Sequence, residues 1–233
     1  MIEIGPGPGG LTRALLEAGA ARVLAVERDP RCVAALTELA AAYPGRLEIV
    51  EADARTVDEA ALVPGPRRIV ANLPYNVATP LLIKWLAQIE LFTDLTLMFQ
   101  KEVAARLTAL PRTGAYGRLS IMAQWRTRPL ALLDLPPGAF VPAPKVTSTL
   151  VALAPLAEPK AAADWDALET VVAAAFNQRR KMLRSALKRL GPDPQALLAV
   201  AGIAPERRAE ELDVTEFCSL ARAWRSRAET ERP

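Results

Sequence analysis

The chain has 233 residues, of which 51% are hydrophobic, so it can bury the core of one medium-sized domain plus a small second one. It contains no histidine, which excludes Ser-His and Cys-His nucleophile pairs, histidine metal sites and imidazole acid–base chemistry. Cys32 and Cys218 are far apart in sequence, and we expect two buried, reduced thiols. These features predict a protein without a metal site.

Charge is distributed unevenly along the chain, although the net charge is only +3. Acidic side chains outnumber basic ones by 10 to 6 in residues 1–60, and basic ones outnumber acidic ones by 10 to 4 in residues 61–157. This asymmetry predicts that a polyanion contacts one side of the molecule. No apolar run reaches the roughly 20 residues of a membrane span, and no leader peptide is evident, so we expect a cytoplasmic protein.

Short β-rich runs alternate with helical patterns in the first half of the chain. Strands are predicted at residues 1–4, 23–26, 47–50, 69–71 and 95–99, and helices at 10–18, 31–42, 78–88 and 101–109. Alternation of this kind, with nearly continuous apolar strands, is typical of a parallel sheet covered by helices on both faces. A more antiparallel end of the sheet is predicted from candidate strands at 119–125, 130–135 and 149–153.

A proline- and alanine-rich stretch at residues 154–164 has the composition of a linker. Helices are predicted beyond it, at residues 164–190, 193–201, 205–211 and 214–228. We therefore predict an α/β Rossmann-like domain over residues 1–157 and a small all-α domain over residues 158–233.

Residues 5–10, Gly-Pro-Gly-Pro-Gly-Gly, lead from the first predicted strand into a helix. Glycines at this place let the backbone turn sharply and approach a ligand closely. Glu27 ends the second strand, where an acid can accept from both ribose hydroxyls, and Asp53 follows the third strand, where it suits an adenine amine. Pro6 and Pro8 remove two N–H groups that a pyrophosphate would use, which favours a ligand without phosphate, such as S-adenosylmethionine.

Residues 72–75, Asn-Leu-Pro-Tyr, follow a buried strand and predict a pocket for a flat ring that carries an amine. The Asn72 side-chain oxygen and the Pro74 carbonyl can accept the two hydrogens of adenine N6, which turns the nitrogen lone pair toward a sulfonium methyl group. Tyr75 would stack on the base, and catalysis would come from orientation and charge placement. Phe140, in the proline-rich loop 140–146, could cover the other face of a flipped base. An ordinary turn that ends a strand is the alternative reading of residues 72–75.

Residues 179–189 contain six basic side chains and no acid. A helix through this region would place Phe176, Leu183 and Leu187 on one face and cations on another, where they can bind phosphates. The predicted RNA-binding residues are Asn177, Arg179, Arg180, Lys181, Arg184 and Lys188.

Together these motifs resemble the KsgA-type ribosomal RNA adenine dimethyltransferases, which belong to a wider family that includes the erythromycin-resistance enzymes. The resemblance covers nearly the whole chain and rests on residues 3–12, 27–29, 53, 72–75, 100–104, 116–120, 140–146 and 176–181. It implies S-adenosylmethionine-dependent dimethylation of N6 of two adjacent adenosines in the 3′-terminal hairpin loop of 16S rRNA during ribosome biogenesis. The cofactor-binding residues that it implies are Glu3, Gly5, Gly7, Glu27, Asp53 and Asn72, and the catalytic ones are Asn72, Pro74, Tyr75 and Phe140.

We expect the partner to be small-subunit rRNA in a 30S assembly intermediate and the protein to be a monomer. Members of the resembled family carry an N-terminal Gln-x-Phe-Leu segment before the glycine strand, and we expect that this sequence starts at an internal methionine. Two alternatives remain open: a ribosome-assembly binding factor with little catalysis, and an erythromycin-resistance-type enzyme that methylates 23S rRNA. A nicotinamide-dependent oxidoreductase is a more distant third alternative.

Overall fold

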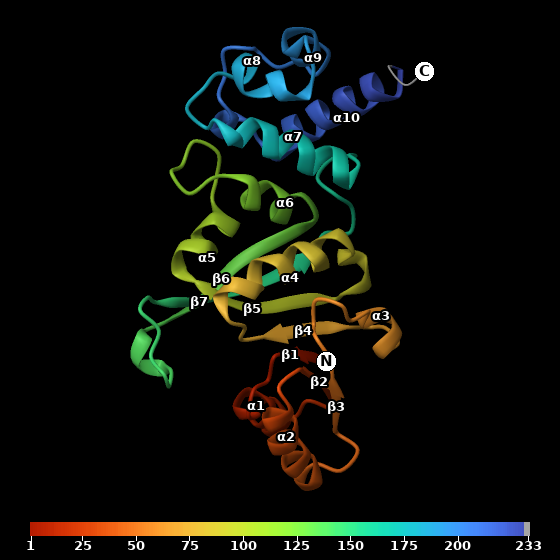
Figure 1. Ribbon diagram of the computed structural model, residues 1–233, viewed down its shortest axis with the longest axis vertical. Helices are drawn as coiled ribbons and strands as arrows, with labels where there is room; N and C mark the ends of the chain where they lie inside the picture. Colours follow the sequence, from red (N-terminus) through yellow and green to blue (C-terminus); the bar gives the residue numbers. More distant parts are fainter. Residues whose placement is uncertain (231–233) are drawn as a thin grey trace. The chain divides into compact units, whose positions relative to one another are not determined.

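The computed structural model describes residues 1–230 and shows a β-sheet with flanking helices and a further set of helices (Figure 1). Its contacts divide the chain into two compact units, and each unit is built from two separate segments. The sheet unit comprises Met1–Lys101 and Leu130–Pro155, and the helical unit comprises Glu102–Pro129 and residues 156–230. The division after Pro155 lies within two residues of the predicted boundary at 157, whereas the assignment of Glu102–Pro129 to the helical unit differs from the prediction.

A seven-stranded sheet in the order β3-β2-β1-β4-β5-β7-β6 forms the frame of the site. The strands are β1 (Ile2–Ile4), β2 (Val23–Glu27), β3 (Leu47–Glu51), β4 (Arg68–Ala71), β5 (Asp94–Gln100), β6 (Thr127–Leu135) and β7 (Ser148–Pro155). Strands β1 to β5 pair in parallel, and β7 pairs antiparallel with β5. The predicted parallel sheet with an antiparallel end is therefore confirmed.

The helices of the sheet unit follow from this strand order. They are α1 (Gly10–Glu17), α2 (Pro30–Ala42), α3 (Glu59–Leu62) and α4 (Tyr75–Ala87). The order runs outward from β1 through β2 to β3 in one direction and from β4 to β5 in the other. Because parallel crossovers are right-handed, α1 and α2 cover one face and α4 covers the other. The reversal between β1 and β4 opens a crevice at the carboxyl ends of these strands.

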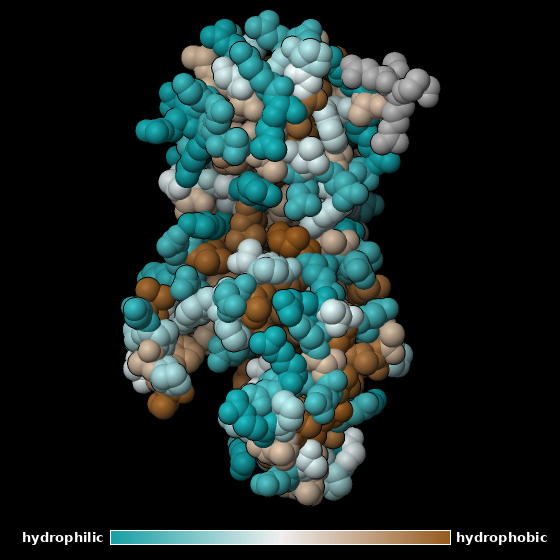
Figure 2. All heavy atoms as spheres, viewed as in Figure 1, coloured by the Kyte–Doolittle hydropathy of each residue, from teal (hydrophilic) through white to brown (hydrophobic). Residues whose placement is uncertain are grey.

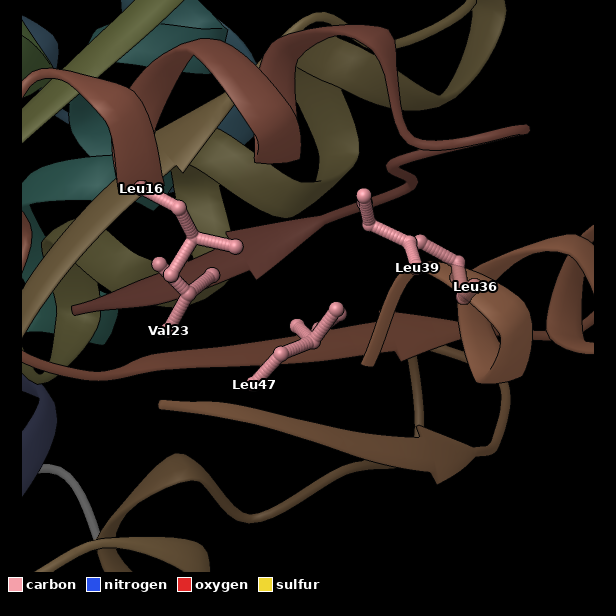
Figure 3. Close-up of a cluster of buried hydrophobic side chains, with 6 residues drawn as sticks. Leu16, Val23, Leu36, Leu39 and Leu47 are labelled. Carbon is pink, nitrogen blue, oxygen red and sulfur yellow. The ribbon is translucent and has the colours of Figure 1, made fainter. Parts of the chain in front are cut away.

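A buried hydrophobic cluster fixes α1 and α2 on the sheet (Figure 3). Its members are Leu16, Val23, Ala25, Leu36, Leu39 and Leu47. Burial of each large side chain stabilises the fold by about 1.5–3 kcal/mol. The cluster also presses on the glycine loop, since a Cβ added at Gly9 would lie 3.0 Å from Cδ2 of Leu39. Gly9 has a φ of +91°, so glycine is required there on both grounds.

The helical unit is packed around aromatic rings. Its helices are α5 (Lys101–Thr108), α6 (Arg118–Arg126), α7 (Trp165–Asn177), α8 (Leu183–Ala186), α9 (Pro194–Val200) and α10 (Val214–Thr230). The first residue of α5, Lys101, belongs to the sheet unit. The Phe176 ring stacks on Phe217 at 5.8 Å and meets the edge of Tyr116 at 6.2 Å. The Tyr116 hydroxyl donates to the Leu212 carbonyl over 2.9 Å. These contacts join the segment 102–129 to the C-terminal helices.

Three predicted elements in this unit are wrong. The predicted helix 205–211 is only a 3₁₀ turn at Ala209–Glu211. Residues 119–125, predicted as a strand, lie in α6, where every residue from Ser120 to Trp125 is buried. A helix that is buried on all sides shows no periodicity, so a short apolar run cannot distinguish it from a strand. The predicted helix 164–190 ends at Asn177 and continues as a turn, α8 and a 3₁₀ turn at Leu187–Leu190.

The cysteines match their prediction only in part. Both are free thiols, but Cys218 is buried whereas Cys32 is half-exposed. Burial raises the pKa of Cys218 to about 11. Within residues 1–230, no helix is long and apolar enough to cross a membrane, and no group of three or more acidic or cysteine side chains could hold a metal.

Candidate functional site

A pocket of about 410 Å³ opens at the carboxyl ends of β1 to β4. This volume lies within the roughly 300–1,000 Å³ that small-molecule sites occupy. The walls contain six of the residues predicted to bind cofactor or to act in catalysis, namely Gly5, Gly7, Glu27, Asp53, Asn72 and Pro74. Apolar side chains form the rest of the lining, including Ile4, Val26, Leu73, Val77 and Leu81. The sheet thus gathers groups that are up to 69 positions apart in the sequence.

The glycine loop lies against the segment 72–75. Gly5 and Gly7 have φ values of +65° and +57°, a region that side chains disfavour. A Cβ at Gly5 would lie 3.0 Å from Cδ2 of Leu73, so the loop backbone packs directly on that leucine. A Cβ at Gly7 would meet nothing within 4 Å, which leaves room for a ligand beside the backbone.

The Glu27 carboxylate organises the same loop. Its Oε2 accepts from the Gly7 N–H over 3.0 Å. Its Oε1 accepts from the N–H groups of Arg28 and Asp29 over 2.8 and 2.9 Å. A carboxylate has about four acceptor sites, so three are in use and one remains for a ribose hydroxyl. The predicted bond to both hydroxyls would require the carboxylate to share an acceptor site.

Asp53 faces the pocket in a fixed orientation because Arg55 grips it. The Arg55 Nε lies 3.1 Å from each carboxylate oxygen, and the Arg55 backbone N–H donates over 2.9 Å. These bonds hold the pKa of Asp53 well below its usual range. The Arg55 Nη2 also donates to Oδ2 over 2.5 Å, so each oxygen of the ionised Asp53 already accepts from two N–H contacts. An adenine amine would have to share an acceptor site with Arg55. No sequence pattern marks Arg55, because a cation two residues after an acid is common on loops.

Asn72 and Pro74 differ in how far their acceptors are available. Asn72 is exposed to the pocket, and its side chain makes no hydrogen bond within residues 1–230. Pro74 is the N-cap of α4, and its carbonyl accepts from the N–H groups of Val77 and Ala78 over 3.0 and 3.2 Å. Both lone pairs of that carbonyl are in use. The Leu73 carbonyl accepts no hydrogen bond in the described part of the chain.

The sequence could not show this because the helix was predicted to begin at residue 78, whereas α4 begins at Tyr75. The role predicted for the Pro74 carbonyl therefore conflicts with its use as a helix cap, and Leu73 offers the available carbonyl of this segment.

Tyr75 and Phe140 do not line the pocket. Tyr75 is half-buried, and its hydroxyl lies 2.7 Å from the Ser148 Oγ. Phe140 is half-buried and follows a 3₁₀ turn at Pro137–Ala139. Their predicted stacking on a base stays a prediction.

Glu3 lies on β1 and does not line the pocket. The side chain alternates with Ile2 and Ile4 along β1 and is only 1% exposed. Neither carboxylate oxygen has a hydrogen bond of good geometry to any residue from 1 to 230. Burial raises the pKa of Glu3 to about 7, and the neighbouring Thr12 hydroxyl offsets part of this effect. A buried, unpaired carboxyl is costly for the fold and therefore typical of functional sites.

The predicted RNA-binding residues lie in the helical unit, where Figure 2 shows mainly hydrophilic residues around α8 and α9. The exposed ones are Asn177, Arg180, Lys181, Arg184 and Lys188. Arg179 is engaged elsewhere, because its guanidinium bonds Glu210 over 2.7 Å and the carbonyls of Gly114 and Thr113 over 2.7 and 2.9 Å. It serves the fold in this structure rather than presenting a cation to phosphate.

Comparison with known sequences agrees with this geometry. The family model described as ribosomal RNA adenine dimethylase matches residues 1–225. The chain is 59% identical to the ribosomal RNA small subunit methyltransferase A of Paramagnetospirillum magneticum, over 97% of this chain and 80% of that protein. It is 58% identical to the protein of that name from Rhodospirillum rubrum, over 96% of this chain and 77% of the relative.

Solved structures show the same fold. A dimethyladenosine transferase from Plasmodium falciparum superposes with a TM-score of 0.82 at 26% sequence identity, and the match covers 97% of this chain and 90% of the transferase. The 23S rRNA methyltransferase ErmE superposes with a TM-score of 0.67 at 28% identity and covers 96% and 90%. The chain therefore belongs to the ribosomal RNA adenine dimethylase family, whose members are methyltransferases that use S-adenosylmethionine.

Proposed function

We propose that the protein dimethylates N6 of two adjacent adenosines in the 3′-terminal hairpin loop of small-subunit rRNA, acting as a cytoplasmic monomer on an assembly intermediate of the subunit. The observation that carries the proposal is the convergence of Gly5, Glu27, Asp53 and Asn72 on one pocket. The names of the small-subunit relatives support the choice of rRNA.

The pocket fits the cofactor in chemistry as well as in size. S-adenosylmethionine supplies an electrophilic methyl group when bound. The Glu27 carboxylate has an acceptor site for a ribose hydroxyl, and the ionised Asp53 would accept from the adenine amine by sharing an acceptor site with Arg55. The open space beside Gly7 lets the ligand approach the backbone. The glycine loop offers few N–H donors to a phosphate, because Pro6 and Pro8 have none and the Gly7 N–H is bonded to Glu27.

Asn72 carries the chemistry on the side of the target adenosine. Its amide oxygen would accept one N6 hydrogen, and the Leu73 carbonyl, which the helix leaves available, would accept the other. These two bonds pull the amine toward tetrahedral geometry and aim its lone pair into the pocket. Methyl transfer leaves N6 cationic and therefore acidic, so the proton passes to solvent and no side-chain base is required. This step needs acceptors that are fixed before the substrate arrives, and residues 72–75 connect β4 rigidly to α4.

The exposed cations of the helical unit supply the RNA affinity. Arg180, Lys181, Arg184 and Lys188 are exposed and follow one another within nine residues. Neutralisation of phosphates releases counterions, so this affinity falls as the salt concentration rises.

The test offers labelled S-adenosylmethionine with small-subunit and large-subunit precursor particles in parallel. The proposal expects label in small-subunit rRNA at two adjacent adenosines near the 3′ end. Label confined to large-subunit rRNA would instead favour the 23S type of enzyme, to which ErmE belongs.

A binding factor without catalysis is separated by a thermal-shift measurement. A catalyst should melt at a higher temperature with saturating cofactor, because a ligand that binds only the native state stabilises it by about 2.7 kcal/mol at 100 times Kd. An unchanged melting temperature, together with retained particle binding, would support the binding factor.

A further inference from the structure

We propose that Ser148 is a positioning residue for methyl transfer, because its buried hydroxyl anchors the ring of Tyr75 so that one ring face stays available to the target adenine. This inference rests on the function proposed above. It assigns a role to a residue outside the pocket lining and outside the predicted site.

The anchor is a single hydrogen bond between two distant parts of the sheet unit. The Tyr75 hydroxyl and the Ser148 Oγ are 2.7 Å apart, and the residues are 73 positions apart in the sequence. Ser148 is 0% exposed, whereas Tyr75 is half-buried. The polar end of the phenol is thus fixed in the interior while part of the ring meets solvent. A tyrosine in this arrangement offers a flat apolar face without freedom to rotate away.

Ser148 is held rigidly by its neighbours in the sheet. It begins β7 and pairs with Gln100 of β5. The Lys101 N–H donates to the Thr147 carbonyl over 2.9 Å, one residue before Ser148. One residue after it, the Thr149 hydroxyl donates to Asp134 over 2.7 Å. An anchor point fixed on both sides transmits little motion to its partner.

Tyr75 is fixed at its other end as well. It is the first residue of α4 and directly follows Pro74, which caps the helix. The backbone is therefore set by the helix and the hydroxyl by the sheet, which together determine both side-chain torsions. Because Tyr75 lies in the same segment, 72–75, as Asn72, the orientation of its ring is tied to the amine acceptors.

The same bond connects Tyr75 to the loop that bears Phe140. That loop ends where β7 begins, at Ser148. The Lys101 Nζ also donates to the second oxygen of Asp134 over 2.6 Å, so the base of the loop is tied to the start of α5 and to β6. Both aromatic residues predicted to stack on the base are thus connected to the start of β7, Tyr75 by its hydrogen bond to Ser148 and Phe140 by the loop that leads into the strand.

The experiment measures single-turnover methyl transfer to small-subunit particles by the variants Ser148→Ala, Tyr75→Phe and the double variant. Thr127→Val is the control, since it also removes a buried hydroxyl, one that donates to the Ala123 carbonyl over 2.6 Å in the helical unit. Cofactor Kd and melting temperature are measured on the same samples.

Each single variant should slow transfer by about 3- to 10-fold at saturating RNA and cofactor, the range that one neutral hydrogen bond supplies. The double variant should be no slower than the slower single variant, since both remove the same bond. Cofactor Kd should stay within about 2-fold, and Thr127→Val should lose stability without a loss of rate. Rates that multiply in the double variant, or a wild-type rate in Ser148→Ala, would overturn the inference.

A spectroscopic readout separates the anchor from the reaction. The chain has three tyrosines, so the ¹³Cζ resonance of Tyr75 can be assigned by its loss in Tyr75→Phe. It should shift in Ser148→Ala and stay in place in Thr127→Val. An unchanged resonance in Ser148→Ala would overturn the anchor itself. Absence of transfer by the wild-type protein would instead overturn the proposed function.

Discussion

Replacement of Glu3 by glutamine should stabilise the protein above neutral pH and remove much of the pH dependence of its unfolding free energy. In the native state, burial raises the pKa of Glu3 from 4.5 to about 7. The native state therefore holds a proton that the unfolded chain has released between these two values. Stability falls as the pH rises through that interval and is level above it, because proton binding by the native state exceeds that of the unfolded state only within it.

The size of the effect follows from the shift. Each pKa unit corresponds to about 1.36 kcal/mol, so the interval from 4.5 to 7 corresponds to roughly 3 kcal/mol, as an upper bound. Glutamine has nearly the same shape and no titration. The difference in unfolding free energy between Glu3→Gln and wild type should therefore grow in favour of the variant by about 2–3 kcal/mol between acidic and mildly alkaline pH.

The assay is urea unfolding of both proteins at several pH values from about 4.5 to 8.5, the range that brackets the two pKa values. Groups other than Glu3 cancel in the difference. Glu59→Gln is a matched control, because Glu59 is also buried but is paired with Lys84 and with the Trp85 indole N–H over 2.9 and 2.7 Å. Glu59→Gln should only lower the free energy of unfolding. Parallel stability curves for Glu3→Gln and wild type would refute the reasoning.

Three further results are expected. Glu27→Gln should weaken cofactor binding by about 10- to 100-fold in calorimetry, because one amide oxygen cannot replace a carboxylate that accepts from three N–H groups. Arg55→Ala should weaken cofactor binding by only about 2- to 5-fold and make that binding less dependent on the salt concentration, since the Arg55–Asp53 ion pair is partly exposed. A plot of log affinity for RNA against log salt concentration falls with a slope whose magnitude should be about 1.5 smaller in the double variant Arg184→Ala, Lys188→Ala. The control Arg13→Ala, which removes an exposed cation of the sheet unit, should leave that slope unchanged.

Each of these results has a contrary outcome. Unchanged cofactor affinity in Glu27→Gln would place the ribose elsewhere, and a loss beyond about 100-fold in Arg55→Ala would mean that Arg55 itself contacts the ligand. An unchanged salt slope in the double variant would remove these two cations from the RNA interface.

The sheet could be predicted because its strands carry their own signal. Residues 23–26 and 95–99 form short, mostly apolar runs, and buried parallel strands require that pattern. Pocket residues at strand ends, such as Glu27 and Asp53, followed from the same logic. Elements defined by distant contacts could not be predicted: the end of α7 coincides with bonds from Arg179 to carbonyls near residue 114.

The parts of the site that the sequence did not reveal depend on hydrogen bonds between segments. The Pro74 carbonyl is occupied because α4 starts three residues earlier than its apolar periodicity indicates. Ser148 lies 73 residues from Tyr75 and has no local feature that marks it. Such pairings are set by the register of β5 and β7, which a single sequence does not determine.

Product analysis of wild type and Asn72→Ala tests the central claim most directly. Small-subunit precursor particles are incubated with S-adenosylmethionine and enzyme, and the rRNA is digested to nucleosides for mass spectrometry. Wild type should form N6,N6-dimethyladenosine at two positions of each rRNA molecule. Asn72→Ala should form almost none while keeping its melting temperature, since the amine then lacks its side-chain acceptor. Dimethyladenosine formed by Asn72→Ala at the wild-type rate would contradict the assignment of the pocket.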